Sequence, residues 1–174
     1  QSTQLKWIAR SGAGMENIDS KIAHEKNIEL YNSPEGNRDA VAEHCIGMIL
    51  SLFNQLNQSD KEVREAKWNR KRNRGIELKG KTIGLLGYGY MGQALAERLV
   101  GFGVRTIAYD KYKSNFSSNV VTEVDLETFL KKTEILSVHL PLTEETTFMV
   151  DYSLLNQFEN NIYLINTARG KNVK

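Results

Sequence analysis

A glycine-rich segment between an apolar run and a helical pattern is the part of this sequence best suited to bind a ligand. Gly87, Gly89 and Gly92 form a GxGxxG motif directly after the apolar residues 81–86. In this setting the first glycine permits a tight turn, the second lets backbone approach a pyrophosphate, and the third lets the next helix pack close to the strand. The N–H groups and positive dipole at the start of that helix would meet the phosphate charge. The motif therefore predicts a dinucleotide-binding turn.

An aspartate follows the next predicted strand at the distance expected for a ribose contact. Residues 105–109 form an apolar run that ends at Asp110, 18 residues beyond Gly92. A carboxylate there can accept hydrogen bonds from the adenosine ribose hydroxyls, and its charge disfavours a 2′-phosphate. We therefore predict NAD rather than NADP as the cofactor. The alternative is an ordinary connection between strand and helix, with Asp110 as a solvated strand end.

Arg169 is the strongest candidate for chemistry on a substrate. It follows the apolar run 161–166, which is predicted to be a strand that ends at the same crevice. A guanidinium in that position could hold a carboxylate by two parallel hydrogen bonds while it polarises a neighbouring carbonyl. The alternative is a surface arginine in a salt bridge.

Apolar runs alternate with helical patterns along most of the chain. Strands are predicted at 5–9, 28–31, 81–86, 105–109, 120–122, 134–141 and 161–166, and helices at 18–25, 39–66, 94–102, 125–132 and 153–158. This alternation favours an α/β fold with a Rossmann-type, doubly wound parallel sheet, in which ligands bind beyond the carboxyl ends of the strands. The first 38 residues are too few to bury a core alone and are expected to belong to a second α/β unit.

The longest predicted element is a helix from Asp39 to about Ala66. Its apolar positions recur with helical spacing, and a helix of that span would be about 42 Å long, enough to bridge two domains or reach a partner subunit. The apolar positions are Val41, Cys45, Met48, Ile49, Leu52, Phe53 and Leu56. His44 and Cys45 are adjacent and therefore point to different faces, so we predict no metal site there.

Composition and charge exclude several classes of protein. Hydrophobic residues make up 40% and charged residues 25% of the 174, and no apolar run approaches the roughly 18 residues of a membrane helix, so no membrane span is predicted. Cys45 is the single cysteine and cannot form an internal disulfide, and no secretory leader is visible. These features favour a reducing cytoplasm.

One segment carries a local excess of positive charge. Residues 61–74 hold seven basic and two acidic side chains, although the whole chain has a net charge of only +2. Such a run could bind nucleic acid, but only Trp68 interleaves with it and no nucleic-acid motif accompanies it. We therefore expect a solvated, mobile or subunit-contacting segment.

Five ordered motifs resemble those of the D-isomer-specific 2-hydroxyacid dehydrogenase family, most closely its phosphoglycerate dehydrogenase-like branch. The matching segments are Arg10–Gly14 with Asn17–Asp19, Asn32–Pro34 with Asn37 and Val41–Glu43, Gly87–Gly92 with Tyr109–Asp110, His139–Thr143, and Asn166–Gly170. The resemblance spans nearly the whole chain. It implies reversible hydride transfer between NAD and C2 of a 2-keto or 2-hydroxy acid, with 3-phosphoglycerate as a candidate substrate.

The resemblance also implies roles for individual residues. The implied substrate-binding residues are Arg10, Ser11, Gly12, Ala13 and Gly14, with Arg10 near a phosphate in phosphoglycerate-type members, and Arg169 is the implied catalytic arginine. The implied cofactor-binding residues are Gly87, Gly89, Tyr90, Met91, Gly92, Asp110, His139, Leu140, Pro141, Thr167 and Ala168.

The sequence departs from the family pattern at its end. Family members use a histidine as general acid and base, and a glutamate that holds it, both well downstream of the arginine. Here the chain stops five residues after Arg169, and His24, His44 and His139 all precede it. We therefore expect an internal fragment that is inactive alone, because general acid catalysis is typically worth roughly 10²- to 10⁴-fold.

The resemblance also predicts an organisation into domains and subunits. Residues 1–38 would be the end of a substrate domain, 39–76 a linking helix and arm, and 77–174 the first five strands of the NAD-binding domain. The family pairs subunits through the nucleotide domain, so a homodimer is expected. The alternative function is a corepressor-like module that binds NAD without catalysis, which would have no need of Arg169.

Overall fold

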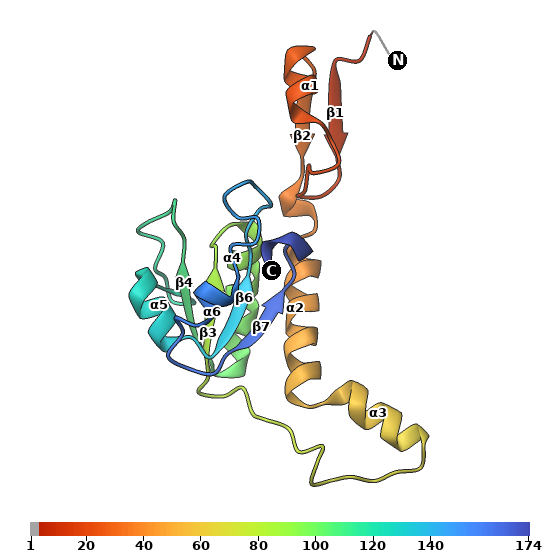
Figure 1. The fold of residues 1–174 in the computed structure, drawn as a ribbon, viewed down its shortest axis with the longest axis vertical. Helices are drawn as coiled ribbons and strands as arrows, with labels where there is room; N and C mark the ends of the chain where they lie inside the picture. Colours follow the sequence, from red (N-terminus) through yellow and green to blue (C-terminus); the bar gives the residue numbers. More distant parts are fainter. Residues whose placement is uncertain (1–3) are drawn as a thin grey trace.

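The computed structural model describes residues 4–174 as two parallel sheets joined by a long helix (Figure 1). A small sheet of β1 (Trp7–Arg10) and β2 (Glu29–Asn32) lies at one end with α1 (Ser20–Glu25). The larger sheet has five strands and lies below it in the view of Figure 1. The α/β fold predicted from the sequence is confirmed.

The larger sheet is parallel throughout and has the strand order β5-β4-β3-β6-β7. Its strands are β3 (Thr82–Leu86), β4 (Arg105–Tyr109), β5 (Thr122–Glu123), β6 (Ile135–Val138) and β7 (Tyr163–Asn166). The chain builds outward from β3 through β4 and β5, then returns to the other side of β3 for β6 and β7. The order therefore reverses between β3 and β6, which is where sheets of this type bind ligands.

Helices cover both faces of this sheet because successive side chains of a strand point to opposite faces. On one face, Ile83 and Leu85 of β3 pack in one cluster with residues of α2 (Arg38–Phe53) and α4 (Tyr90–Leu99). On the other face, Leu86 packs in a second cluster with residues of α5 (Leu126–Lys132) and α6 (Tyr152–Leu155). Short 3₁₀ turns are η1 (Pro34–Gly36), η2 (Val100–Phe102) and η3 (Gly170–Asn172).

The helical region expected from Asp39 to Ala66 is two helices. After α2 the chain turns at Gln55, which has a left-handed φ of 51°, and then forms α3 (Leu56–Arg64). The Gln55 side-chain amide donates to the carbonyl oxygen of Arg72 at 3.0 Å, and the Ile76 N–H donates to the carbonyl oxygen of Phe53 at 3.0 Å. The returning chain thus fixes the break, which helical periodicity alone does not reveal.

The predicted apolar face of this region divides into a buried and an exposed part. Cys45, Ile49 and Phe53 are buried against the sheet side of the molecule. Of the other apolar side chains, Val41 is half-buried, whereas Met48 and Leu52 of α2 and Leu56 of α3 are exposed by 36%, 47% and 51%. We term these three exposed residues the outer stripe, and neighbouring exposed apolar side chains commonly mark a contact surface.

The arm formed by α3 and the basic segment 61–74 protrudes from the molecule (Figure 1). Its organising residue is Glu62, which is 4% exposed. The Glu62 carboxylate accepts hydrogen bonds from the side-chain amides of Gln58 at 2.6 Å, Asn69 at 2.9 Å and Asn73 at 2.8 Å. These donors, led by Gln58, lower the pKa of Glu62 to about 2. The loop is therefore tied down at one point despite its charge.

Within residues 4–174, none of the helices combines the length and apolar character needed to cross a membrane.

Candidate functional site

The glycine turn after β3 places its three glycines in three different surroundings. Gly87 has a φ of +94°, and a Cβ there would lie 2.8 Å from the carbonyl oxygen of His139. A Cβ at Gly92 would lie 2.5 Å from the carbonyl oxygen of Gly87, so the start of α4 packs directly on the turn. At Gly89 a Cβ would meet no atom within 4 Å. The open side of the turn at Gly89 has the room that a pyrophosphate needs.

The start of α4 supplies hydrogen-bond donors to this open side. Gly89 is the N-cap residue and provides no side chain to occupy the first N–H groups of the helix. Gly89, Tyr90 and Met91 line the central cavity described below. Free N–H groups and the positive end of the helix dipole favour an anion at this position. The residues present therefore fit the pyrophosphate of a dinucleotide.

Asp110 lies at the end of β4 and is held by backbone. The Tyr88 N–H donates to Oδ2 of Asp110 at 2.8 Å, and the Tyr112 N–H donates to Oδ1 at 2.9 Å. The first of these bonds ties the carboxylate directly to the glycine turn. A carboxylate fixed there keeps lone pairs for ribose hydroxyls, as the sequence predicts.

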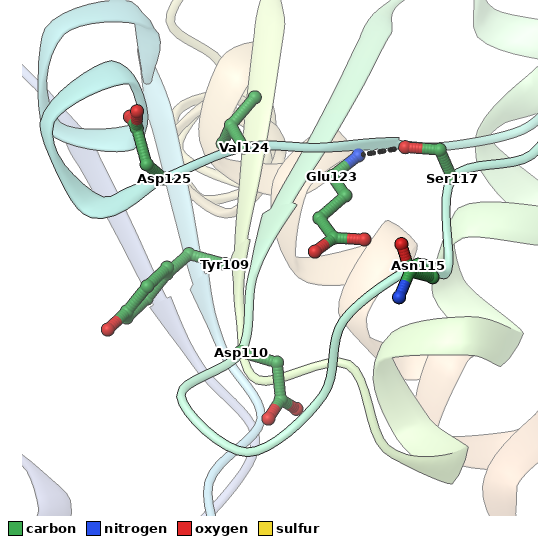
Figure 2. A pocket seen from close by; sticks show the side chains of 7 residues that line it. All are labelled: Tyr109, Asp110, Asn115, Ser117, Glu123, Val124 and Asp125. Carbon is green, nitrogen blue, oxygen red and sulfur yellow. Dashed lines mark hydrogen bonds between the residues drawn. The ribbon is translucent and has the colours of Figure 1, made fainter.

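A hollow of about 660 Å³ lies beside Asp110, and Figure 2 shows the side chains that line it. It is lined by Tyr109, Asp110, Asn115, Ser117, Glu123, Val124 and Asp125. The other two carboxylates have structural partners, because Glu123 accepts from the Phe116 N–H at 2.8 Å and Asp125 caps α5 through the Thr128 N–H at 2.7 Å. Three acidic side chains around one hollow disfavour an additional phosphate, which agrees with NAD rather than NADP.

His139 lies at the end of β6 and belongs to a chain of polar contacts that enters the core. Its Nε2 is 2.9 Å from Oγ of Ser137, and that hydroxyl is 3.3 Å from Sγ of the buried Cys45 on α2. Burial lowers the pKa of His139 to about 4. Its imidazole is therefore neutral at pH 7, and burial likewise raises the pKa of the Cys45 thiol.

A central cavity of about 830 Å³ brings most of the predicted site residues together. It lies between the small sheet and the carboxyl ends of β3, β6 and β7. The predicted residues that line it are Arg10, Ser11, Gly12, Ala13, Gly14, Gly89, Tyr90, Met91, His139, Leu140, Pro141, Thr167, Ala168 and Arg169. Asp110 lines the neighbouring hollow, whereas Gly87 and Gly92 form the turn itself without lining the cavity.

Arg169 crosses the gap between the two sheets. Its Nε lies 2.7 Å from Oε1 of Glu16, its Nη1 donates to the carbonyl oxygen of Ala168 at 2.8 Å, and its side chain is 38% exposed. A Cβ on Gly14 would lie 1.9 Å from Nη2 of Arg169, so the end of the Arg169 side chain packs directly on this glycine. Arg169 is thus in a salt bridge, but the bridge lies inside the candidate site.

The backbone around Arg169 is held by two asparagines to which the sequence assigns no role. The Arg169 N–H donates to Oδ1 of Asn172 at 3.0 Å, and the Asn166 side-chain amide donates to the carbonyl oxygen of Arg169 at 2.8 Å. Asn172 is fully buried. The N–H and the carbonyl oxygen of Arg169 are both hydrogen-bonded, so the backbone from which the guanidinium extends is held in place.

Glu16 is a site residue that the sequence analysis missed. Its carboxylate lies between Arg169 and Arg10, whose Nη1 is 3.5 Å from Oε2. Burial acts to raise the pKa of Glu16, but the Glu16 backbone N–H and the two arginines outweigh it and lower the pKa. No local pattern marks this residue, because its main partner comes from the other end of the chain.

The loop Arg10–Gly14 uses its carbonyl groups for its own stability. The carbonyl oxygen of Gly12 accepts from the Ser33 N–H at 3.1 Å, that of Ala13 accepts from the Asn32 side chain at 2.7 Å, and that of Gly14 accepts from Arg10. These bonds fix the loop, whose residues line the central cavity, where backbone N–H groups that face a ligand would suit a carboxylate.

Comparison with known proteins identifies the family of this chain. Residues 46–174 match the family model described as "D-isomer specific 2-hydroxyacid dehydrogenase, NAD binding domain". The chain is 39% identical to the hydroxypyruvate reductase of Thermotoga maritima over 166 residues, covering 95% of this chain and 54% of that protein. It is 36% identical to the D-3-phosphoglycerate dehydrogenase of Archaeoglobus fulgidus, covering 95% and 32% of the two chains.

A solved dehydrogenase structure is similar to this chain over nearly its whole length. The NAD-dependent formate dehydrogenase of Staphylococcus aureus, solved in complex with NAD, superposes with a TM-score of 0.88 at 32% identity, covering 99% of this chain and 52% of that one. The chain thus spans about half or less of the length of the relatives that it matches. The prediction of NAD as the cofactor is confirmed, and the chain belongs to the D-isomer-specific 2-hydroxyacid dehydrogenase family.

Proposed function

We propose that the whole protein transfers a hydride reversibly between NAD and C2 of a D-2-hydroxy acid or 2-keto acid. The observation that carries this proposal is the central cavity, which places Arg169 and the loop Arg10–Gly14 opposite the start of α4. A cationic side chain and an anion-binding helix start on one cavity suit a carboxylate substrate beside a dinucleotide.

In this function the nucleotide is bound mainly by backbone. The N–H groups of Tyr90 and Met91 hold the pyrophosphate, and Asp110 accepts hydrogen bonds from the adenosine ribose. Residues 139–141 with Thr167 and Ala168 line the remaining cofactor surface. When bound, NAD supplies or accepts the hydride, while these residues orient it and exclude water.

The substrate is held by Arg169 and by the loop N–H groups of Ser11 to Gly14. The guanidinium binds the substrate carboxylate and polarises the neighbouring carbonyl, and Glu16 keeps that guanidinium in the cavity. His139 is an unsuitable proton donor because burial holds its pKa at about 4. We therefore propose that another group of the whole protein donates the proton, and that residues 1–174 alone turn over no substrate.

The contacts of Arg10 bear on whether the substrate carries a phosphate. A phosphorylated acid such as 3-phosphoglycerate would need Arg10 near its phosphate, but Arg10 donates to the Gly14 carbonyl and lies 3.5 Å from Glu16. Its present contacts favour a small unphosphorylated 2-keto acid. A comparison of kcat/KM for hydroxypyruvate and 3-phosphohydroxypyruvate with the whole protein would decide between the two.

We further propose the domain division of residues 1–38, 39–76 and 77–174 into the end of a substrate domain, a linking segment with the arm, and the NAD-binding domain. The two separate sheets support this division.

The free, buried thiol of Cys45 suits a reducing cytoplasm, which we propose as the location.

We propose that the outer stripe of Met48, Leu52 and Leu56, together with the arm, pairs two copies of the protein. Val63 and Trp68 extend the apolar surface along the arm and are exposed by 57% and 81%. Light scattering should give the mass of a dimer, and Leu52→Glu should convert it to a monomer. A monomeric mass for the unchanged protein would contradict the proposal.

NADH binding by residues 1–174, measured by fluorescence titration, tests the nucleotide site. Asp110→Asn keeps the shape of the side chain but removes its charge, and should weaken NADH binding by at least about ten-fold, since hydrogen bonds to a charged group are lost. Asp60→Asn is the matched control, because Asp60 lies on α3 and pairs with Arg64. Saturable binding that only the control retains supports the proposal, and no binding by the folded chain contradicts it.

A further inference from the structure

A lysine stands directly beside the residue that selects NAD. Lys111 follows Asp110 in the loop after β4, and its side chain is 58% exposed. In dinucleotide sites a carboxylate at the end of this strand excludes a 2′-phosphate, whereas a cation nearby accommodates one. The same turn therefore carries two residues with opposite effects on the choice between NAD and NADP.

Glu145 is the ion-pair partner of Lys111. The Lys111 ammonium is paired with Oε1 of Glu145, and the Tyr112 hydroxyl donates to Oε2 of the same carboxylate. Lys111 Nζ also lies 5.4 Å from the centre of the Tyr112 ring. Lys111 and Tyr112 lower the pKa of Glu145, which is thereby kept ionised. The cluster thus combines one cation, one anion and one aromatic side chain.

The position of this cluster connects it to the nucleotide site. Lys111 and Tyr112 follow β4, whereas Glu145 lies in the loop after β6, and these two strands flank β3 with its glycine turn. The Tyr112 N–H also holds Asp110, at 2.9 Å. The other cation of the loop, Lys113, donates to the Tyr88 carbonyl oxygen at 3.0 Å. Lys111 is therefore the cation whose direction depends on Glu145.

We infer that Glu145 is a specificity-determining residue, which holds Lys111 away from the ribose so that Asp110 alone sets the preference for NAD. This inference rests on the proposed nucleotide site and names a regulator of its selectivity. Without Glu145, Lys111 is free to approach a 2′-phosphate and offsets part of the repulsion by Asp110. The pair is exposed, so its removal should shift the ratio of NADH to NADPH affinity by only about two- to five-fold.

The test is a fluorescence titration of residues 1–174 with NADH and with NADPH. Glu145→Gln should tighten NADPH binding by about two- to five-fold, with a much smaller effect on NADH. Glu144→Gln is the matched control, because it removes the same charge from the neighbouring exposed position. The double variant Lys111→Gln/Glu145→Gln should lose the gain, and added salt should reduce it.

The outcomes separate this inference from the proposed function. If Glu145→Gln and Glu144→Gln change NADPH affinity equally, or if the gain persists in the double variant, general charge and not Lys111 is responsible and the inference is overturned. Intact NADH binding with unchanged selectivity also overturns it and leaves the nucleotide site standing. Absence of NADH binding by the folded wild-type chain overturns both.

Discussion

The two walls of the central cavity are built in different ways. The nucleotide wall is the glycine turn with the start of α4, and its shape depends on backbone atoms, such as the 2.5 Å approach that a Cβ on Gly92 would make to Gly87. The substrate wall is the loop Arg10–Gly14 with Glu16, and it depends on ion pairs to Arg169 and Arg10. Steric fit dominates in the first wall, whereas in the second wall ion pairs add to the hydrogen bonds of the loop.

This difference has consequences for how each wall responds to change. A backbone turn packed against a buried strand is insensitive to pH and salt, but it tolerates almost no added volume. Ion pairs between partly exposed side chains tolerate volume but weaken with salt and with acid. In a cavity of this construction the proposed cofactor surface is rigid, while the proposed substrate surface can adjust.

The largest expected effect comes from adding one methyl group to the nucleotide wall. Gly92→Ala forces the Gly87 carbonyl or α4 to move, which should lower the free energy of unfolding by about 1–3 kcal/mol. It should also weaken NADH binding by at least about ten-fold, which is a loss of roughly 1.4 kcal/mol. Urea unfolding and fluorescence titration measure the two effects.

Gly47→Ala is the control for this substitution. Gly47 lies in α2 and a Cβ there would meet no atom within 4 Å, so alanine should stabilise the chain by about 0.5–1 kcal/mol through its helix propensity. Equal destabilisation by both alanines would show that the close approach at Gly92 is unimportant.

Removal of the Glu16 charge should weaken the substrate wall. Glu16→Gln removes the charge that Arg169 and Arg10 share and should lower the free energy of unfolding by about 1 kcal/mol at pH 7. NADH binding should be unchanged, since Glu16 lies on the opposite wall. Glu25→Gln, an exposed substitution on α1, is the control in the same part of the chain.

Acid should erase the difference between wild type and Glu16→Gln. The pKa of Glu16 is lowered in the folded chain from its ordinary value of 4.5. Its contribution to stability is therefore complete above pH 4.5 and is lost as the pH falls through the folded pKa. Unfolding curves at pH 7 and at successively lower pH values measure this. A difference that stays constant would mean that the carboxylate charge does not hold the wall.

Glu62 sharpens the contrast, because it is a buried carboxylate held mainly by neutral amides, with Nη1 of Arg72 farther away at 3.5 Å. Glu62→Gln should release Asn69 and Asn73, so trypsin should cut the basic segment 61–74 several-fold faster, roughly in proportion to the opening of the arm. Glu65→Gln is the control, since Glu65 pairs with Lys67 on the surface. Equal cleavage of the two variants would refute the role given to Glu62.

The pH response of Glu62 should extend to lower pH than that of an ordinary carboxylate. Its pKa falls from 4.5 to about 2 in the folded chain, mainly through Gln58. The arm should therefore stay protected above pH 4.5 and lose protection progressively as the pH falls toward 2. Cleavage by an acid-stable protease across this range would follow the change.

The smallest expected change between pH 8 and pH 5 is in the protonation of His139, on the nucleotide wall. Burial lowers its pKa from 6.5 to about 4, so its neutral form stabilises the fold above pH 6.5, and this contribution is lost as the pH falls through about 4. The NMR chemical shift of the His139 ring should stay constant between pH 8 and pH 5. A titration near pH 6.5 would contradict the burial of this imidazole.

The sequence by itself determined the nucleotide wall. The GxGxxG motif, the strand that precedes it and Asp110 after the next strand are set by local order along the chain, and β4 has the bounds predicted for it. Glycine conformation, strand alternation and the start of a helix are short-range properties, because they depend on neighbouring residues. Such features can be predicted from a pattern.

Only the tertiary structure decided the substrate wall, the arm and the cluster of Lys111, Tyr112 and Glu145. The pairing of Glu16 with Arg169 and of Lys111 with Glu145 joins residues that are far apart in sequence, and no periodicity predicts a partner for a charged side chain. The break at Gln55 likewise depends on the returning residues Arg72 to Ile76. Long-range contacts of this kind override local helical propensity, since hydrogen bonds and packing outweigh the few tenths of a kcal/mol, roughly, that separate most residues in helix propensity.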